Sequence, residues 1–222
     1  MQKKLNKKKI SAWKRLPVRL IVIVGQRKAG KDALITYIKS RFRIVHHYRI
    51  ADGPLKIIEA LGLSPSRAIL QKLFGVNALL YPILGESAYI RRVTHLIDSE
   101  KPRLAIVEAI RTKEEYEEFA KKRGGVLIGI SAPDQVRYLR AFRDAHRREN
   151  REKKDEGEIT FKEFMKRERL PIERDIRWIV GRADFILTND SDDYPAFYKK
   201  IDAVMRELGI SKKRGRIGAR RN

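Results

Sequence analysis

A run of branched apolar residues that ends in a glycine-rich turn is the feature that most limits the fold of this chain. Residues 20–24 read LIVIV, and the turn GQRKAGKD follows at residues 25–32. Beyond the turn, apolar residues recur at helical spacing as far as Phe42. A short and fully apolar run is typical of a strand buried on both faces, as in parallel sheets covered by helices. The sequence therefore predicts an α/β fold built around this strand.

The rest of the chain alternates between short β-branched runs and longer helical patterns, as parallel sheets wrapped by helices do. The predicted strands lie at residues 20–24, 44–50, 104–108, 126–131 and 185–188. The predicted helices lie at residues 31–42, 54–61, 66–73, 87–99, 113–122, 133–153, 160–166, 171–181 and 194–208. The polar stretch at 147–158 is expected to be a mobile insertion. We therefore predict one α/β domain of three layers with a five-stranded parallel sheet.

The glycine-rich turn has the spacing of a phosphate-binding P-loop. Gly25 and Gly30 permit a tight turn, and Lys31 can reach the β- and γ-phosphates of a nucleotide. The N–H groups and the dipole at the start of the following helix also favour an anion. The alternative is a basic turn with no ligand. The predicted nucleotide-binding residues are Gly25, Gln26, Arg27, Lys28, Ala29, Gly30, Lys31, Asp32 and Ala33.

The residue after Lys31 departs from the strict motif. A Ser or Thr hydroxyl usually meets Mg²⁺ at this position, whereas this chain has Asp32 and then Ala33. A carboxylate is a hard oxygen ligand that can approach Mg²⁺ directly or through water. Its alternative role is a favourable negative charge in the first helical turn. Asp32 is therefore the predicted metal residue, with ATP and Mg²⁺ as the predicted ligand and cofactor.

Several segments resemble known kinases. The turn GQRKAGKD is similar to the variant P-loop of phosphomevalonate kinase and of bacteriophage deoxynucleoside monophosphate kinases, in which Asp also follows Lys. The segment ADGPLKIIEALGL resembles the one after the second strand of those families. The segments ISAPDQVRYLRAFR and ADFILTND resemble parts of dephospho-CoA kinase and of small kinase-like ATPases.

The resemblance spans about residues 18–208 and implies the fold of the nucleoside monophosphate kinase superfamily, which is a three-layer P-loop NTPase fold. It implies acceptor-binding helices at about 52–99 and an arginine-bearing lid at about 137–170. The expected organisation is a basic N-terminal arm at 1–17, a kinase domain at 18–210 and a basic tail at 211–222.

Acceptor residues are expected at the ends of the second and third strands, because open α/β sheets bind ligands beyond the carboxyl ends of their strands. In ADGPLK, Asp52 and Lys56 would face the acceptor; the alternative for Asp52 is a helix cap. In LAIVEAIR, Arg111 would hold an acceptor phosphate, and Glu108 or Asp52 would orient the attacking oxygen. Related kinases often carry Asp at the position of Glu108. The alternative is a salt bridge between neighbouring turns.

The lid is expected on the helix after SAP. Arg140, Arg143 and Arg147 recur at helical spacing and so share a face, although a solvated basic helix would have the same pattern. The resemblance implies that such arginines close over the transferring phosphoryl group, with Arg140 and Arg143 as the favoured catalytic pair beside Lys31. It also implies that Asn189, in TNDSDD, contacts the adenine; an Asx-turn is the alternative.

Charge is concentrated at the two ends of the chain. Residues 1–19 hold eight Lys or Arg and residues 211–222 hold six, with no acid in either stretch, in a chain of net charge +23. Such ends are expected to be mobile and to attract nucleic acid without reading its sequence, or else only to keep the protein soluble. Trp13 is expected to pack on the body rather than to stack on a base.

The expected function is transfer of a phosphoryl group from ATP to a small phosphorylated acceptor, preferably a nucleoside or deoxynucleoside monophosphate. Dephospho-CoA or another metabolite is the first alternative, and a nucleotide-dependent RNA-binding protein is the second. No apolar run reaches the roughly 20 residues that cross a bilayer, so no membrane partner is expected and the predicted location is the cytoplasm. The absence of cysteine excludes disulfides and thiolate metal sites.

Overall fold

A five-stranded parallel sheet forms the centre of the protein. The computed structural model describes residues 7–43, 46–64, 87–108, 110–146, 160–169 and 171–213, together with residues 69, 73, 82 and 83. The strand order is β2-β3-β1-β4-β5. The strands are β1 (Arg19–Gly25), β2 (His46–Arg49), β3 (Leu104–Glu108), β4 (Val126–Ser131) and β5 (Phe185–Thr188). The predicted fold is confirmed, and β3, β4 and β5 have the predicted bounds.

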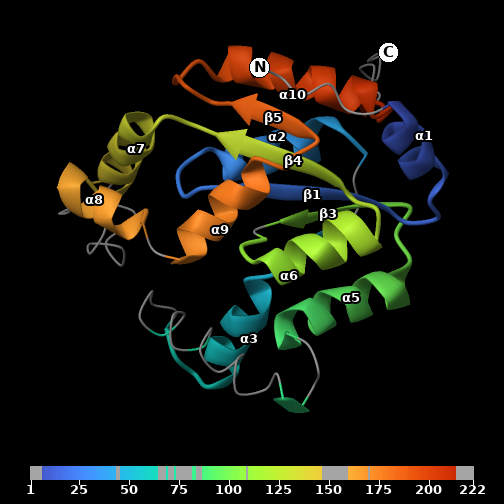
Figure 1. Ribbon diagram of the computed structural model, residues 1–222, viewed down its shortest axis with the longest axis horizontal. Helices are drawn as coiled ribbons and strands as arrows, with labels where there is room; N and C mark the ends of the chain where they lie inside the picture. The colour runs from blue at the N-terminus through green and yellow to red at the C-terminus, as the bar shows by residue number, and fades with distance from the viewer. Residues whose placement is uncertain are drawn as a thin grey trace, which may run out of the picture.

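Helices cover both faces of the sheet (Figure 1). The helices on or beside one face are α1 (Lys7–Arg15), α2 (Lys31–Arg41) and α10 (Tyr194–Glu207). The other face carries α5 (Ala88–Glu100), α9 (Pro171–Val180) and α6 (Lys113–Tyr116), which continues into a π-helical turn, η1 (Glu117–Lys122). Within the described residues, no helix combines the length and apolar character needed to cross a membrane.

Alternation along β1 explains why two separate cores form. Ile21 and Ile23 pack with α2 and α10, whereas Leu20, Val22 and Val24 pack with α5, η1 and α9. All five side chains are at most 1% exposed. Since successive side chains of a strand point to opposite faces, a fully apolar β1 is what a sheet covered on both sides requires. The resulting rigid strand carries the glycine-rich turn at its carboxyl end.

Two helices lie beyond the carboxyl ends of the strands and are called the lid helices here: α7 (Asp134–His146) and α8 (Phe161–Arg167). Their contact is aromatic, because the Tyr138 ring meets Phe161 and Phe164 edge-on at centroid distances of 5.3 and 5.8 Å. The helix α3 (Asp52–Ala60) follows β2 at the same end of the sheet. Most of the predicted helix at 66–73 and the predicted insertion at 147–158 lie outside the described residues.

The predicted mobile N-terminal arm is wrong for residues 7–15, which form α1. Ile10 and Trp13 lie three residues apart on one face of the helix and are 6% and 1% exposed. Trp13 Nε1 donates a hydrogen bond of 2.9 Å to Leu20 O, and Lys9 forms an ion pair with Asp184. Two apolar residues are therefore enough to dock this basic segment, and the packing role expected for Trp13 is confirmed.

The first residues of the predicted C-terminal tail are also held by the body. Lys212 forms an antiparallel bridge with Phe42, and Lys213 N donates to Arg41 O at 2.7 Å. These contacts place residues 211–213 beside the end of α2. Residues 1–6 and 214–222, the outer parts of both predicted arms, lie outside the described residues.

Replacing Trp13 with alanine tests whether α1 belongs to the folded body. We expect Trp13→Ala to lower the free energy of unfolding by about 3–5 kcal/mol, because it removes a buried aromatic ring and leaves a cavity. Urea denaturation followed by circular dichroism measures the change. Arg15→Ala, on the exposed side of the same helix, should change it by less than about 0.5 kcal/mol. Equal small losses in both variants would contradict the docking of α1.

Candidate active site

The turn between β1 and α2 leaves the start of α2 without a side-chain cap. Gly30 is the N-cap residue, with a φ of 107° that favours glycine, and no side chain accepts a hydrogen bond from the first turn. The first N–H groups of a helix have no intrahelical acceptor, so an uncapped start leaves them for an anion. A Cβ at Gly30 would lie 2.1 Å from Asn189 Nδ2, so only glycine fits here. The turn therefore fits a phosphate group.

Lys31 lies against the turn it follows. Its Nζ donates hydrogen bonds to Gly25 O at 2.6 Å and to Gln26 O at 3.0 Å. Desolvation by burial, with a smaller repulsion from Arg111, lowers the pKa of Lys31 from 10.5 to about 8. A negatively charged ligand would reverse both effects by supplying the missing counter-charge. The sequence expectation that Lys31 serves the phosphate site therefore agrees with its surroundings.

Three side chains hold the carbonyl groups of the turn from outside. Asn189 Nδ2 donates to Ala29 O at 2.9 Å, Arg137 Nη1 to Arg27 O at 3.2 Å, and Arg140 Nη1 to Lys28 O at 3.4 Å. Lys28 itself has a φ of 60°, a strained value for a residue other than glycine. These three hydrogen bonds hold the carbonyl oxygens toward the surrounding side chains. They therefore fix the backbone of the turn in a curved form, as a phosphate-binding turn requires.

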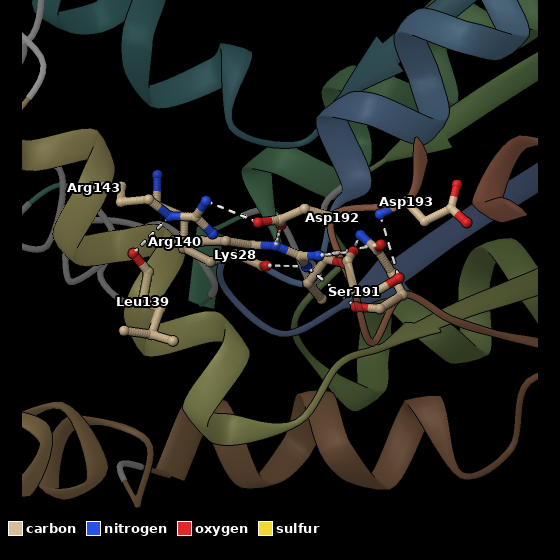
Figure 2. A network of polar contacts seen from close by, with 9 residues as sticks. Lys28, Leu139, Arg140, Arg143, Ser191, Asp192 and Asp193 are labelled. Atoms are coloured by element: carbon tan, nitrogen blue, oxygen red, sulfur yellow. Dashed lines mark hydrogen bonds and ion pairs between the residues drawn. The ribbon is translucent and has the colours of Figure 1, made fainter. Parts of the chain in front are cut away.

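Arg140 connects the turn to the loop between β5 and α10, as Figure 2 shows. Its guanidinium also donates to Asn189 O and Oδ1, both at 3.2 Å, and to Ser191 O at 2.7 Å. Arg143, with a side chain 54% exposed, reaches Asp192 Oδ2 at 2.8 Å. The structure thus brings together Arg140 and Asn189, two residues predicted separately, and places Arg143 at the outer edge of the same network.

Arg137 was not selected from the sequence, yet it is the most deeply buried cation of the lid helices. It is 0% exposed, and its Nη1 lies 2.7 Å from Glu168 Oε2. The same carboxylate oxygen accepts from Gln26 Nε2 at 2.9 Å, so Glu168 joins the lid to the turn. Arg137 Nε has no hydrogen-bond partner among the described residues. The two residues Arg137 and Arg140 lie on neighbouring turns of one helix, so spacing along the sequence could not show which of them is buried.

Arg111, a predicted acceptor residue, lies in the loop after β3. Its backbone N–H donates to Glu115, whose carboxylate also accepts from Thr112 N at 3.1 Å and completes a capping box at the start of α6. Burial raises the pKa of Glu115 to about 7. The charge of Arg111 is near enough to Lys31 to help lower the pKa of the lysine. An anion placed between them would relieve their repulsion.

Glu108 has partners that the sequence did not reveal. It is 6% exposed, with Oε2 at 2.6 Å from His47 Nε2 and Oε1 at 3.0 Å from Arg49 Nε. Both partners lie on β2, which pairs with β3, so the salt-bridge alternative is realised across strands rather than between turns. Parallel pairing of β2 with β3 places His47 beside Glu108. Both carboxylate oxygens of Glu108 are therefore occupied.

Two further predicted acceptor residues lie on α3. Asp52 is in its first turn, 3.8 Å from Arg49 Nε, and makes no capping hydrogen bond. Lys56 is exposed one turn later, and within the described part of the chain it makes no polar contact with the glycine-rich turn. The structure thus connects Asp52 to Glu108 through Arg49, while Lys56 stands apart from the other predicted residues.

The described residues contain no group of three or more His, Cys, Asp or Glu that could hold a metal ion. Asp32 is exposed in the first turn of α2, beside Lys31. A single carboxylate beside a phosphate-binding turn fits Mg²⁺ that arrives with a nucleotide, because Mg²⁺ is commonly bound by one or two carboxylates plus substrate phosphates. It does not fit a metal held by protein ligands alone.

The chain is similar to proteins whose names give no activity. No family model matches it. A UPF0200 protein of Saccharolobus islandicus is 23% identical over 189 residues, which cover 84% of this chain and 92% of that protein. A UPF0200 protein of Pyrobaculum aerophilum is 25% identical over 86% of this chain and 99% of that protein. Another, from Sulfurisphaera tokodaii, is 32% identical over 57% of this chain and 65% of that protein.

Two matches among solved structures differ in their TM-scores. TT1252 from Thermus thermophilus superposes with a TM-score of 0.53 at 18% identity, over 87% of this chain and 99% of that one. Dephospho-CoA kinase from Campylobacter jejuni matches with a TM-score of 0.44 at 19% identity, over 86% of this chain and 96% of that one. The first likeness supports the α/β fold described above, and at this level of identity it shows the fold alone.

The pKa of Lys31 predicts how ATP affinity depends on pH. The ammonium form is lost above pH 8 in the free protein, whereas bound phosphates favour it, so ATP affinity should fall as the pH rises from 7 to 9.5. Each pH unit above the pKa should weaken binding by up to about tenfold. Isothermal titration calorimetry with EDTA present measures this without Mg²⁺. Lys31→Arg, which stays charged, should remove the dependence; the same slope in both proteins would contradict the assignment.

Proposed function

We propose that this protein transfers a phosphoryl group from ATP to a small phosphorylated acceptor. The observation that carries the proposal is the uncapped start of α2 beside Lys31, faced by Arg111 from the acceptor side and closed by Arg137 from the lid. Phosphoryl transfer requires mainly positioning and stabilisation of negative charge, and this arrangement gathers cations from three separate elements around one turn.

The proposed roles follow from position. Gly25 to Ala33 cradle the donor phosphates, Lys31 and Arg137 stabilise the transferring group, and Arg140 and Arg143 fix the lid on the turn. Asn189 remains the residue proposed beside the adenine, since its loop borders the same turn. On the acceptor side, Arg111 holds a phosphate, with Asp52, Lys56 and Glu108 lining that side. Mg²⁺, when bound near Asp32, would neutralise charge on the phosphates.

The proposed reaction is compatible with two classes of acceptor, which differ in the group that attacks the γ-phosphorus. The preference drawn from the sequence is a nucleoside or deoxynucleoside monophosphate, in which a phosphate oxygen attacks. The alternative is a phosphorylated metabolite in which a hydroxyl attacks, such as dephospho-CoA. Arg111 serves either class, because both carry a phosphate to be held.

The test is an assay of ADP release with ATP and Mg²⁺. The acceptor panel contains ribo- and deoxynucleoside monophosphates, dephospho-CoA and phosphomevalonate. We expect one class to raise ADP release well above the rate without acceptor. Lys31→Ala should reduce that turnover by at least about a hundredfold, because it removes a cation from the transition state. Unchanged turnover in Lys31→Ala, or binding of ATP with no stimulation by any acceptor, would contradict the proposal.

A second proposal, nucleic-acid contact through the basic ends, gains support from tertiary structure. Lys213 N bonds to Arg41 O at 2.7 Å, and a Cβ on Gly209 would lie 3.3 Å from Lys14 Nζ. Lys14, Arg41 and Lys213 are exposed. These three residues, called the basic end here, come from α1, α2 and the C-terminal segment, and Figure 1 shows α1 on the opposite side of the sheet from the lid helices. A polyanion could bind there without blocking the turn.

Charge reversal tests the basic end. Replacing Lys14, Arg41 and Lys213 with Glu should weaken binding of a random-sequence single-stranded RNA and reduce its salt dependence, by about 0.7 in the log–log slope per lost phosphate contact. Fluorescence polarisation at several salt concentrations measures both. The control reverses Lys122, Lys162 and Lys166, which are exposed elsewhere. Equal losses in the two triple variants would show that net charge alone is responsible.

A further inference from the structure

Glu173 is a carboxylate near Lys31 to which none of the roles above applies. It lies in the first turn of α9, a helix that packs on the sheet through Ile176 and Ile179. Its Oε2 atom is buried and has no hydrogen-bond partner among the described residues. A buried carboxylate oxygen without a donor costs free energy, so such an atom calls for an explanation.

The groups that act on Glu173 come from four elements. Burial raises the pKa of Glu173 above 4.5 and the neighbouring Glu168 adds to this, while Arg111, Lys31 and Arg137 oppose it. The three cations are the acceptor-side arginine, the P-loop lysine and the buried lid arginine. The charges of Arg111, Lys31 and Arg137 thus all act on Glu173, and α9 packs on β1, the strand that carries the glycine-rich turn.

The other carboxylates around this space are already engaged. Glu108 forms a hydrogen bond with His47 and an ion pair with Arg49. Glu168 forms an ion pair with Arg137 and accepts a hydrogen bond from Gln26. Glu115 accepts two backbone N–H groups at the start of α6. Asp32 is exposed beside the proposed metal position. Among these carboxylates, Glu173 is the one with a buried oxygen that has no hydrogen-bond donor in the described residues, so a lone pair of this oxygen is not engaged.

We propose that Glu173 is the general base of the reaction and that the attacking group of the acceptor is a hydroxyl. The inference rests on the proposed function and narrows it, since a phosphate oxygen is already deprotonated near neutral pH and needs no base, whereas a hydroxyl must lose its proton. The hydroxyl oxygen forms a bond to the γ-phosphorus of ATP, the bond from that phosphorus to the β,γ-bridging oxygen breaks, and ADP leaves. The hydroxyl proton passes to Glu173 Oε2.

A purely structural role for Glu173 would have a different geometry. A counter-ion for Arg111, Lys31 or Arg137 would place its oxygens on their N–H groups, as Glu168 does on Arg137 at 2.7 Å. Glu173 instead keeps Oε2 free of any donor in the described part of the chain, although three cations lie close enough to act on it. This arrangement leaves a lone pair for a proton from the acceptor.

The test compares Glu173→Gln with Asp175→Asn on the same helix. Glutamine keeps the size of the side chain but cannot accept the proton, so kcat with a hydroxyl acceptor should fall by about a hundredfold or more. The Kd of ATP should stay within about threefold, because the donor phosphates contact other residues. Asp175 is 37% exposed, 3.8 Å from Lys113, and its variant should keep wild-type turnover.

A pH profile separates a base from a structural residue. In the wild type, kcat should fall as the pH drops through the pKa of Glu173 in the complex, and this acidic limb should be absent from the residual activity of Glu173→Gln. Glu173→Asp, which keeps a displaced carboxylate, should retain the limb at reduced kcat. If Glu173→Gln does not fold, as judged by its thermal unfolding curve, Glu173→Asp provides the comparison.

The outcomes distinguish this inference from the proposed function. Turnover restricted to nucleoside monophosphates, or a kcat of Glu173→Gln within threefold of wild type on a hydroxyl acceptor, would overturn the role of Glu173 while the kinase function stood. Where only Glu173→Asp folds, wild-type kcat in that variant would overturn the role in the same way. ATP binding without turnover on any acceptor would overturn both.

Discussion

The arrangement of the site depends on how the glycine-rich turn is held from outside. Three consecutive carbonyl groups, those of Arg27, Lys28 and Ala29, receive hydrogen bonds from Arg137, Arg140 and Asn189. Each bond removes a carbonyl from the concave side and leaves that side to N–H groups and the start of α2. The positive φ of Lys28 in this turn would be strained on its own. Hydrogen bonds from α7 and from the loop after β5 stabilise the turn, so the turn and α7 are packed together.

Charge balance around Lys31 follows from this packing. Lys31, Arg111 and Arg137 lie close enough to influence one another or their shared carboxylates, and burial lowers the pKa of Lys31 to about 8. Glu168 offsets part of this charge through Arg137. The remaining positive potential is a reason for a polyphosphate to bind, since desolvated cations gain most from an anion that enters without water. The charges of all three cations also act on Glu173.

The two ends of the sheet have different surfaces. The carboxyl ends of the strands carry the turn, Arg111, Glu108 and the lid helices, as expected for an open parallel sheet. The opposite side carries α1, which Trp13 and Ile10 anchor to the core while its other side stays exposed. This separation means that a polyanion at the basic end and a nucleotide at the turn need not compete for the same residues.

The sequence by itself determined the sheet, its five strands and the glycine-rich turn, because β-branched runs, helical periods and glycine spacing are local properties of the chain. It also singled out Lys31, Arg140 and Asn189 as separate candidates, through segments that resemble those of known kinases. Only the tertiary structure decided which carboxylates are occupied. Glu108 meets His47 because β2 pairs with β3, and the charge of Lys31 acts on Glu173 because α9 packs on β1. Likewise, α1 docks because the core offers a place for Trp13. Such contacts join residues far apart in the chain, and spacing along one sequence carries no signal for them.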